Sequence, residues 1–129
     1  MEEASVRRLN GLQLAFIGDT VYDLYARGRA LEEHDESVRQ LHRRAVARVN
    51  AAAQARAFAA VESLLSEEEA DVARRGRNAH SRPPKNQDPG DYARATALEA
   101  LCGYLYLMGR NERLDELMRV IRQEEEDHA

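Results

Sequence analysis

All three prolines of this 129-residue chain lie within one segment, residues 76–90. Proline breaks the interior of a helix, so the sequence on either side of this segment is free to be helical. Alanine is abundant there, β-branched residues are few, and no segment alternates strictly between apolar and polar residues. This pattern predicts an all-α fold. The length suits one domain with a single modest core, which we expect to span residues 1–129.

Apolar residues that recur at helical spacing predict five helices. We expect them at residues 11–30, 37–64, 66–76 and 88–108, and from residue 111 onward. Ser66 and Glu69 form a capping-box pattern, and Asp88–Pro89 is a typical helix start. The acidic residues 124–129 are expected to fray. The apolar face of the first helix is predicted to comprise Leu14, Ile17, Val21, Leu24 and Tyr25.

Residues 76–90 are expected to form a long loop, which Gly76 begins by capping the preceding helix. Such a loop in a small helical domain is more often functional than incidental. It overlaps one of two basic zones, residues 37–61 and 72–87, which together contain ten basic residues and no acid. The net charge of −4 argues against a nucleic-acid binder, but the zones indicate local surfaces that attract anions.

The remaining composition excludes several classes of protein. Cys102 is the only cysteine, which rules out an internal disulfide framework and a zinc site built from several thiolates. The four histidines have no ligand-like spacing. The apolar run 100–108 is far shorter than the roughly 20 residues that span a bilayer, and the acidic N-terminus lacks a signal core. We therefore expect a cytoplasmic protein that does not contact membranes.

Two carboxylates interrupt apolar helical segments. Asp19 follows Gly18, which costs a helix about 1 kcal/mol relative to alanine and so indicates the close approach of another helix or a ligand. Glu99 is the only charge in residues 95–109. The two acids would converge on a hard cation such as Mg²⁺, with Asp23 as a further candidate ligand one turn after Asp19. The alternative is that each acid pairs with an arginine from a neighbouring helix.

These segments resemble a known family. Residues 14–23 (LAFIGDTVYD) look like the signature helix of ribonuclease III domains, and residues 98–107 (LEALCGYLYL) look like their second acidic motif. The order of the motifs extends over nearly the whole chain, from about Leu9 to Leu117. Further segments are similar to the compact subclass called Mini-III, namely Leu41–His42, Ala53–Ala55, Arg75–Ala79 and Pro84–Asn86.

The resemblance implies a homodimeric helical bundle of the ribonuclease III type. Its members are Mg²⁺-dependent endonucleases, with Mn²⁺ as a substitute metal, that cut double-stranded RNA and leave 5′-phosphate ends. Mini-III members mature large-subunit (23S) ribosomal RNA precursors, so that RNA is the expected partner, and a ribosomal protein that presents it is a further candidate. Asp19 and Glu99 match the catalytic, metal-binding acids of the family. Ala15 and Thr96 stand where fuller ribonuclease III enzymes carry additional acids.

The basic zones would then contact RNA, because A-form duplexes are recognised mostly through phosphates and 2′-hydroxyls. Two other functions stay open. One is a catalytically silent dimer of this fold that binds structured RNA, which Ala15 and Thr96 favour. The other is a small Mg²⁺-dependent pyrophosphohydrolase that uses the acids at 67–71. The predicted RNA-binding residues are Arg74, Arg75, Arg77, Asn78, Arg82, Lys85 and Asn86, with Arg43, Arg44 and Gln54 as additional candidates.

Overall fold

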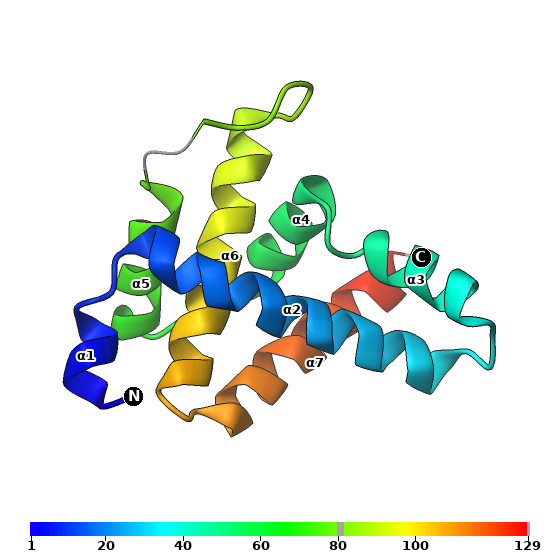
Figure 1. Cartoon of the computed structure of the whole chain (residues 1–129), viewed down its shortest axis with the longest axis horizontal. Coiled ribbons are helices and arrows are strands. Elements are labelled where there is room, and N and C mark those ends of the chain that lie inside the picture. The colour runs from blue at the N-terminus through cyan, green and yellow to red at the C-terminus, as the bar shows by residue number, and fades with distance from the viewer. Residues whose placement is uncertain (80–81, 129) are drawn as a thin grey trace.

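The computed structural model describes residues 1–79 and 82–128, and every regular element within them is a helix, which confirms the all-α prediction (Figure 1). None of these helices is long and apolar enough to cross a membrane. In chain order they are α1 (Glu3–Arg7), α2 (Gly11–Glu33), α3 (Val38–Val46), α4 (Ala51–Val61), the 3₁₀ helix η1 (Glu62–Leu64), α5 (Glu67–Arg77), α6 (Pro89–Leu107) and α7 (Asn111–Asp127).

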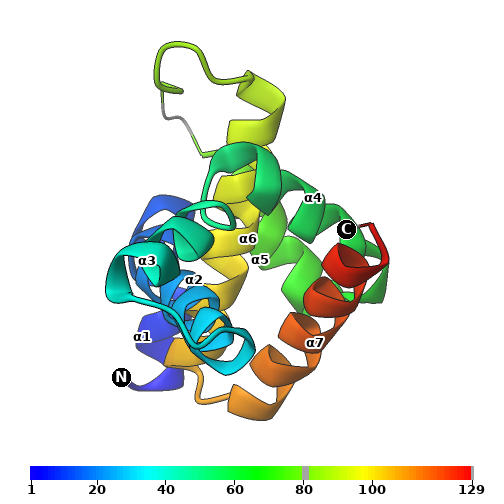
Figure 2. The same cartoon turned by 90° about the vertical axis from the view of Figure 1, so that its right-hand side faces the viewer.

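Helix α6 forms the centre of the fold. Helix α2 crosses it, and α4 and α5 pack along it (Figures 1 and 2). Ala97, Leu98, Leu101 and Leu105 of α6 are almost completely buried against these neighbours. Each buried leucine contributes roughly 1.5–3 kcal/mol, so α6 is the element on which the others depend for their packing.

Two glycines bring α2 and α6 into backbone contact. A Cβ atom added to Gly18 would lie 1.6 Å from the carbonyl oxygen of Glu99, and one added to Gly103 would lie 2.0 Å from that of Leu14. No side chain fits at these distances, so only glycine permits the crossing. The close approach that Gly18 predicted is therefore that of another helix, and it places Asp19 next to Glu99.

The prediction of one helix over residues 37–64 is wrong. The structure has α3, then α4 and the short η1, with a break at residues 47–50. Asn50 has extended backbone angles and caps α4, because its side-chain oxygen accepts from the Ala53 N–H at 2.9 Å. Its amide nitrogen also donates to the Ala47 carbonyl at 2.9 Å. These bonds favour a new helix start over continuation of the first helix.

The predicted loop 76–90 is shorter in the structure, and its residues 80 and 81 lie outside the described part of the chain. Helix α5 continues through Gly76 and ends at Arg77, with Asn78 as its C-cap. A Cβ on Gly76 would lie 2.7 Å from that of Ala100, so this glycine allows α5 to pack on α6 rather than ending α5. Asp88 caps α6 as predicted.

Arginine–carboxylate pairs fasten α7 to the other helices. Glu69 on α5 is 4% exposed and accepts two hydrogen bonds from Arg113, both at 2.8 Å. Near the other end of α7, Glu125 accepts from Arg29 of α2 at 3.0 Å. The acidic tail was expected to fray, but α7 stays helical through Asp127. Residue 129 lies outside the described residues.

Candidate active site

Asp19 of α2 and Glu99 of α6 come together where the two helices cross. Asp19 is exposed and Glu99 is partly buried, so the pair opens to solvent on one side. Burial and the adjacent Asp19 carboxyl raise the pKa of Glu99 to about 8. Two carboxylates this close cannot both ionise easily unless a cation lies between them.

No arginine neutralises the charge of this pair within residues 1–79 and 82–128, because neither carboxylate takes part in an ion pair there. The alternative, in which Asp19 and Glu99 each pair with an arginine, is therefore not found among the described residues. Carboxylates elsewhere in the chain have such partners, as Glu69 has with Arg113 at 2.8 Å. The partly buried Glu99 thus differs from the buried Glu69, because its neighbouring charged group is a second acid rather than an arginine.

The other candidate ligands are not gathered at the pair. Asp23 accepts from Arg27 at 2.9 Å, one turn further along α2. The Thr96 hydroxyl donates to the carbonyl of Tyr92 at 2.9 Å, and Ala15 is buried. Among the residues that the structure describes, no three histidine, cysteine or acidic side chains group as a metal site.

Two carboxylates nevertheless fit a magnesium ion. Mg²⁺ keeps several waters and takes one or two protein carboxylates together with phosphate oxygens of a substrate. Asp19 and Glu99 supply those two oxygen ligands, and they lack a cationic side chain that would compete. The donor set therefore suits a hard divalent cation that completes its shell with water and substrate.

Gln54 lies on α4 close to Glu99 and is 4% exposed. Its side-chain amide lowers the pKa of Glu99, whereas the Asp19 carboxyl raises it. The Nε2 atom of Gln54 is buried and reaches no hydrogen-bond partner within the described residues. Gln54, a predicted RNA-binding residue, is thus almost entirely covered by protein in this structure.

The predicted RNA-binding residues on α5 have partners within the protein. Arg74 pairs with Asp71 at 3.1 Å, and Arg77 lies 3.7 Å from Glu62. Arg75 is only partly exposed, and it donates to the carbonyl of Leu9 at 3.1 Å. Arg74, Arg77 and the C-cap residue Asn78 are exposed, whereas Arg75 connects α5 to the segment before α2.

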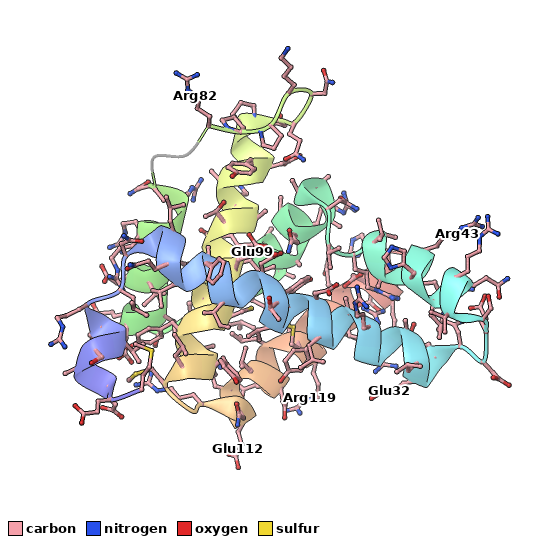
Figure 3. The ribbon with its side chains drawn as sticks, viewed as in Figure 1. Glu32, Arg43, Arg82, Glu99, Glu112 and Arg119 are labelled. Atoms are coloured by element: carbon pink, nitrogen blue, oxygen red, sulfur yellow. The ribbon has the colours of Figure 1, made fainter. Side chains whose placement is uncertain are left out.

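The loop before α6 carries two further exposed cations of the second basic zone, Arg82 and Lys85. Figure 3 shows Arg82 on this loop, with its side chain pointing away from the helices. Lys85 and Asn86 are also exposed, and the Gln87 N–H donates to the carbonyl of Pro84 at 3.3 Å. Asn86 has a φ of 70°, which asparagine tolerates as the third residue of such a turn. No ion pair involves Arg82 or Lys85 in the described part of the chain.

The first basic zone extends over α3 and α4. In Figure 3, Arg43 on α3 and Arg82 in the loop mark different ends of the protein, with Glu99 between them in this view. Arg43 is exposed, and Arg44 forms an ion pair with Glu36. Arg43 and Arg82 therefore do not lie together around the acid pair in a single chain.

Sequence reasoning missed an apolar surface on α2. Phe16 is 82% exposed, and Leu24, which was predicted to face the core, is 69% exposed. Leu12 and Leu31 on the same helix are also exposed. The helix is apolar on more than one face, so its pattern alone does not say which leucines are buried. An exposed stripe of this kind often marks a protein interface.

A model of the ribonuclease III domain matches residues 12–110, so the chain belongs to the ribonuclease III family. That range includes both acidic motifs and the loop between α5 and α6.

Relatives that match most of this chain are called Mini-ribonuclease 3. The protein from Symbiobacterium thermophilum is 45% identical over 92% of this chain and 92% of its own length. The protein from Gloeobacter violaceus is 39% identical over 100% of this chain and 94% of its own. A crystal structure of a Fusobacterium nucleatum protein matches 94% of this chain and 98% of that one, with a TM-score of 0.83 and 28% identity. The resemblance to Mini-III in the sequence is thereby confirmed.

Proposed function

We propose that this endoribonuclease cuts double-stranded RNA with the help of a divalent cation, Mg²⁺ or in its place Mn²⁺, held by Asp19 and Glu99. The observation that carries the proposal is the convergence of these two carboxylates on one surface without an arginine partner among the described residues. An acid pair of this kind costs free energy in the absence of a cation, and proteins retain such costs at functional sites.

The side chains of the pair define what the site does. Asp19 is the exposed acid and Glu99 the partly buried one, so substrate approaches from the side of Asp19. Glu99 must lose its proton before it holds a cation, and its raised pKa places that step near neutral pH. A divalent cation at such a pair lowers the pKa of a bound water and stabilises negative charge on a phosphate. No histidine is needed as a general base.

Duplex RNA would be positioned by the exposed cations of the loop before α6. Arg82 and Lys85 lack ion-pair partners in the described part of the chain, and Asn86 presents a side-chain amide on the same turn. Arg74, Arg77 and Asn78 are exposed at the adjoining end of α5. Phosphates of A-form RNA suit such a surface because recognition there depends on backbone shape. Arg43 and Arg44 would contact a more distant part of the duplex.

The exposed apolar stripe of α2 supports a homodimer. Leu12, Phe16 and Leu24 lie on the same helix as Asp19, and Phe16 is 82% exposed. A two-fold dimer joined through α2 would bury these side chains and carry two acid pairs. Two sites suit a duplex substrate, since each strand then meets one of them.

The finer assignment follows the family. We propose that the substrate is a precursor of large-subunit (23S) ribosomal RNA, that cleavage leaves 5′-phosphate ends, and that a ribosomal protein presents the RNA. The enzyme would act in the cytoplasm, where this precursor is found.

A catalytically silent RNA-binding dimer is the second candidate, because Ala15 and Thr96 leave only two acids at the site. The pyrophosphohydrolase alternative has less support. It needs several free acids on α5, but Glu68 is bound to Arg110 at 2.6 Å and Glu69 to Arg113 at 2.8 Å.

The decisive experiment compares Asp19→Asn and Glu99→Gln with the parent protein on a defined RNA duplex in Mg²⁺. We expect each substitution to lower the cleavage rate by more than about 100-fold, beyond the usual effect of residues that only support a metal ligand. Glu112→Gln is the control, since this acid lies at the start of α7, away from Glu99 (Figure 3). Parent protein that binds the duplex but does not cut it would favour the silent dimer, and full cleavage by both variants would exclude the proposed site.

A further inference from the structure

Three polar side chains are buried in the described part of the chain, and two of them are satisfied. Glu69 accepts from Arg113, and the Thr96 hydroxyl donates to the Tyr92 carbonyl. The third, Gln54, leaves its Nε2 without a hydrogen-bond partner. A buried amide that lacks a partner destabilises the folded protein, so its presence requires an explanation.

The position of Gln54 on α4 is one that normally carries an apolar residue. Ala57, Phe58 and Val61 follow it at helical spacing and are all buried. Leucine or methionine at position 54 would complete this apolar stripe without a buried polar group. The amide is therefore not needed for packing α4 against α6.

The neighbour of this amide is Glu99. Helix α4 packs directly on α6, and Gln54 is one of only two side chains, with Asp19, whose hydrogen-bonding groups act on the Glu99 carboxyl. Asp19 occupies the exposed side of the carboxyl and Gln54 the buried side. An amide N–H on the buried side is a suitable donor to the Glu99 carboxyl, and its bond to an ionised carboxylate is the stronger, charge-assisted kind.

We propose that Gln54 is a positioning residue, whose Nε2 donates to the ionised Glu99 carboxylate when a divalent cation is bound and thereby fixes the orientation of that ligand. The inference rests on the proposed function of the Asp19–Glu99 pair. The Nε2 atom of Gln54 reaches no hydrogen-bond partner within the described residues, and a cation that fixes the orientation of the Glu99 carboxylate would bring one of its oxygens within reach of this donor. Second-layer partners of this kind orient carboxylate ligands in many metal sites.

The test measures Mn²⁺ binding to RNA-free protein by isothermal titration calorimetry, and the melting temperature of the metal-free protein. Gln54→Leu removes the donor, and Gln54→Met does the same with a side chain of similar length. We expect both variants to bind Mn²⁺ about 10- to 100-fold more weakly. We also expect their metal-free melting temperature to be unchanged or higher, because the unsatisfied amide is gone. In cleavage assays the Mg²⁺ concentration for half-maximal rate should rise while the KM for RNA stays the same.

The matched control is Gln123→Leu, the same chemical change on the exposed surface of α7, where Gln123 donates only to Asp127. It should alter neither quantity. Unchanged Mn²⁺ affinity in both Gln54 variants would overturn the inference. A fall in both melting temperature and affinity would overturn it as well, since that result assigns Gln54 a packing role. If Glu99→Gln itself leaves Mn²⁺ affinity unchanged, the proposed metal site fails, and that outcome is distinct from failure of the Gln54 variants alone.

Discussion

Two pairs of helices in this protein are joined by carboxylates in opposite ways. Between α5 and α7, Glu69 is buried but bound by Arg113 at 2.8 Å, which lowers the pKa of Glu69. At the crossing of α2 and α6, Glu99 is partly buried beside a second acid, and its pKa rises to about 8. The first arrangement stabilises the fold at neutral pH, whereas the second costs free energy there.

The difference between the two regions distinguishes carboxylates that stabilise the fold from carboxylates that bind a ligand. An arginine partner satisfies a buried acid permanently, so the α5–α7 contact needs nothing further. The negative charge of the acid pair is neutralised only when a cation binds from solution. The helix crossing is therefore a binding site rather than a stabilising ion pair. The sequence distinguishes the two only in part, because Asp19 and Glu99 interrupt apolar segments but the arginine that pairs with Glu69 is distant in sequence.

The crossing itself is expected to be the most sensitive point. Gly18→Ala would place a Cβ atom 1.6 Å from the Glu99 carbonyl oxygen, and only separation of the two helices relieves that overlap. We expect a loss of about 3 kcal/mol or more in the free energy of unfolding, together with loss of RNA cleavage. Urea unfolding followed by circular dichroism measures the first quantity.

Gly28→Ala is the matched control on the same helix, since a Cβ there meets nothing within 4 Å. It should stabilise the protein by about 0.5–1 kcal/mol through helix propensity. Similar stabilities for the two variants would contradict the backbone contact between α2 and α6.

Breaking the satisfied region should harm stability without harming the site. Glu69→Gln leaves Arg113 without its bidentate partner, and we expect the free energy of unfolding to fall by about 2–3 kcal/mol. Mn²⁺ affinity of the folded protein should not change. Glu67→Gln, at an exposed position in the first turn of α5, is the control and should cost less than about 1 kcal/mol. A large drop in metal affinity with Glu69→Gln would mean that the two regions are coupled.

The two regions should also respond to pH with opposite sign. The pKa of Glu69, beside Arg113, is lowered, so its stabilising contribution is present above the unfolded pKa near 4.5 and is lost as the pH falls through its lower folded value. The pKa of Glu99 is raised to about 8, so the metal-free protein should lose stability as the pH rises from about 4.5 to 8. Glu99→Gln should remove the second dependence and keep the first. Thermal melts without metal across pH 3–9 test this expectation.

Much of the fold could be predicted because it depends on local signals. The caps at Ser66 and Asp88 were read correctly from residue type, and Gly18 correctly indicated a close approach. The break at Asn50 was missed because its capping signal stands before a run of alanines that favours an uninterrupted helix. Gly76 was misread because its role depends on α6, which is distant in sequence.

Site residues could be predicted where a charged residue interrupts an apolar segment. They could not be predicted where tertiary packing determines which face of a helix is buried. Asp19 and Glu99 were found because acids in apolar helical segments are costly, and the structure brings them together. Gln54 was placed on the RNA surface because its sequence neighbourhood does not reveal that this face of α4 packs against α6. Phe16 was overlooked for the same reason, since α2 is apolar on two faces.

The smallest expected effect concerns two basic side chains that belong to neither the α5–α7 contact nor the acid pair. Arg82 and Lys85 have no ion-pair partner in the described residues, so replacing both with glutamine removes charge without breaking an internal contact. If they contact phosphates, RNA binding should weaken uniformly across sequences, and the slope of log Kd against log salt should fall by about two. Stability and Mn²⁺ affinity should stay the same, because the loop lies outside both helix contacts. Arg119→Gln on α7 is the control, and an equal change in its salt slope would show that RNA responds to net charge rather than to the loop (Figure 3).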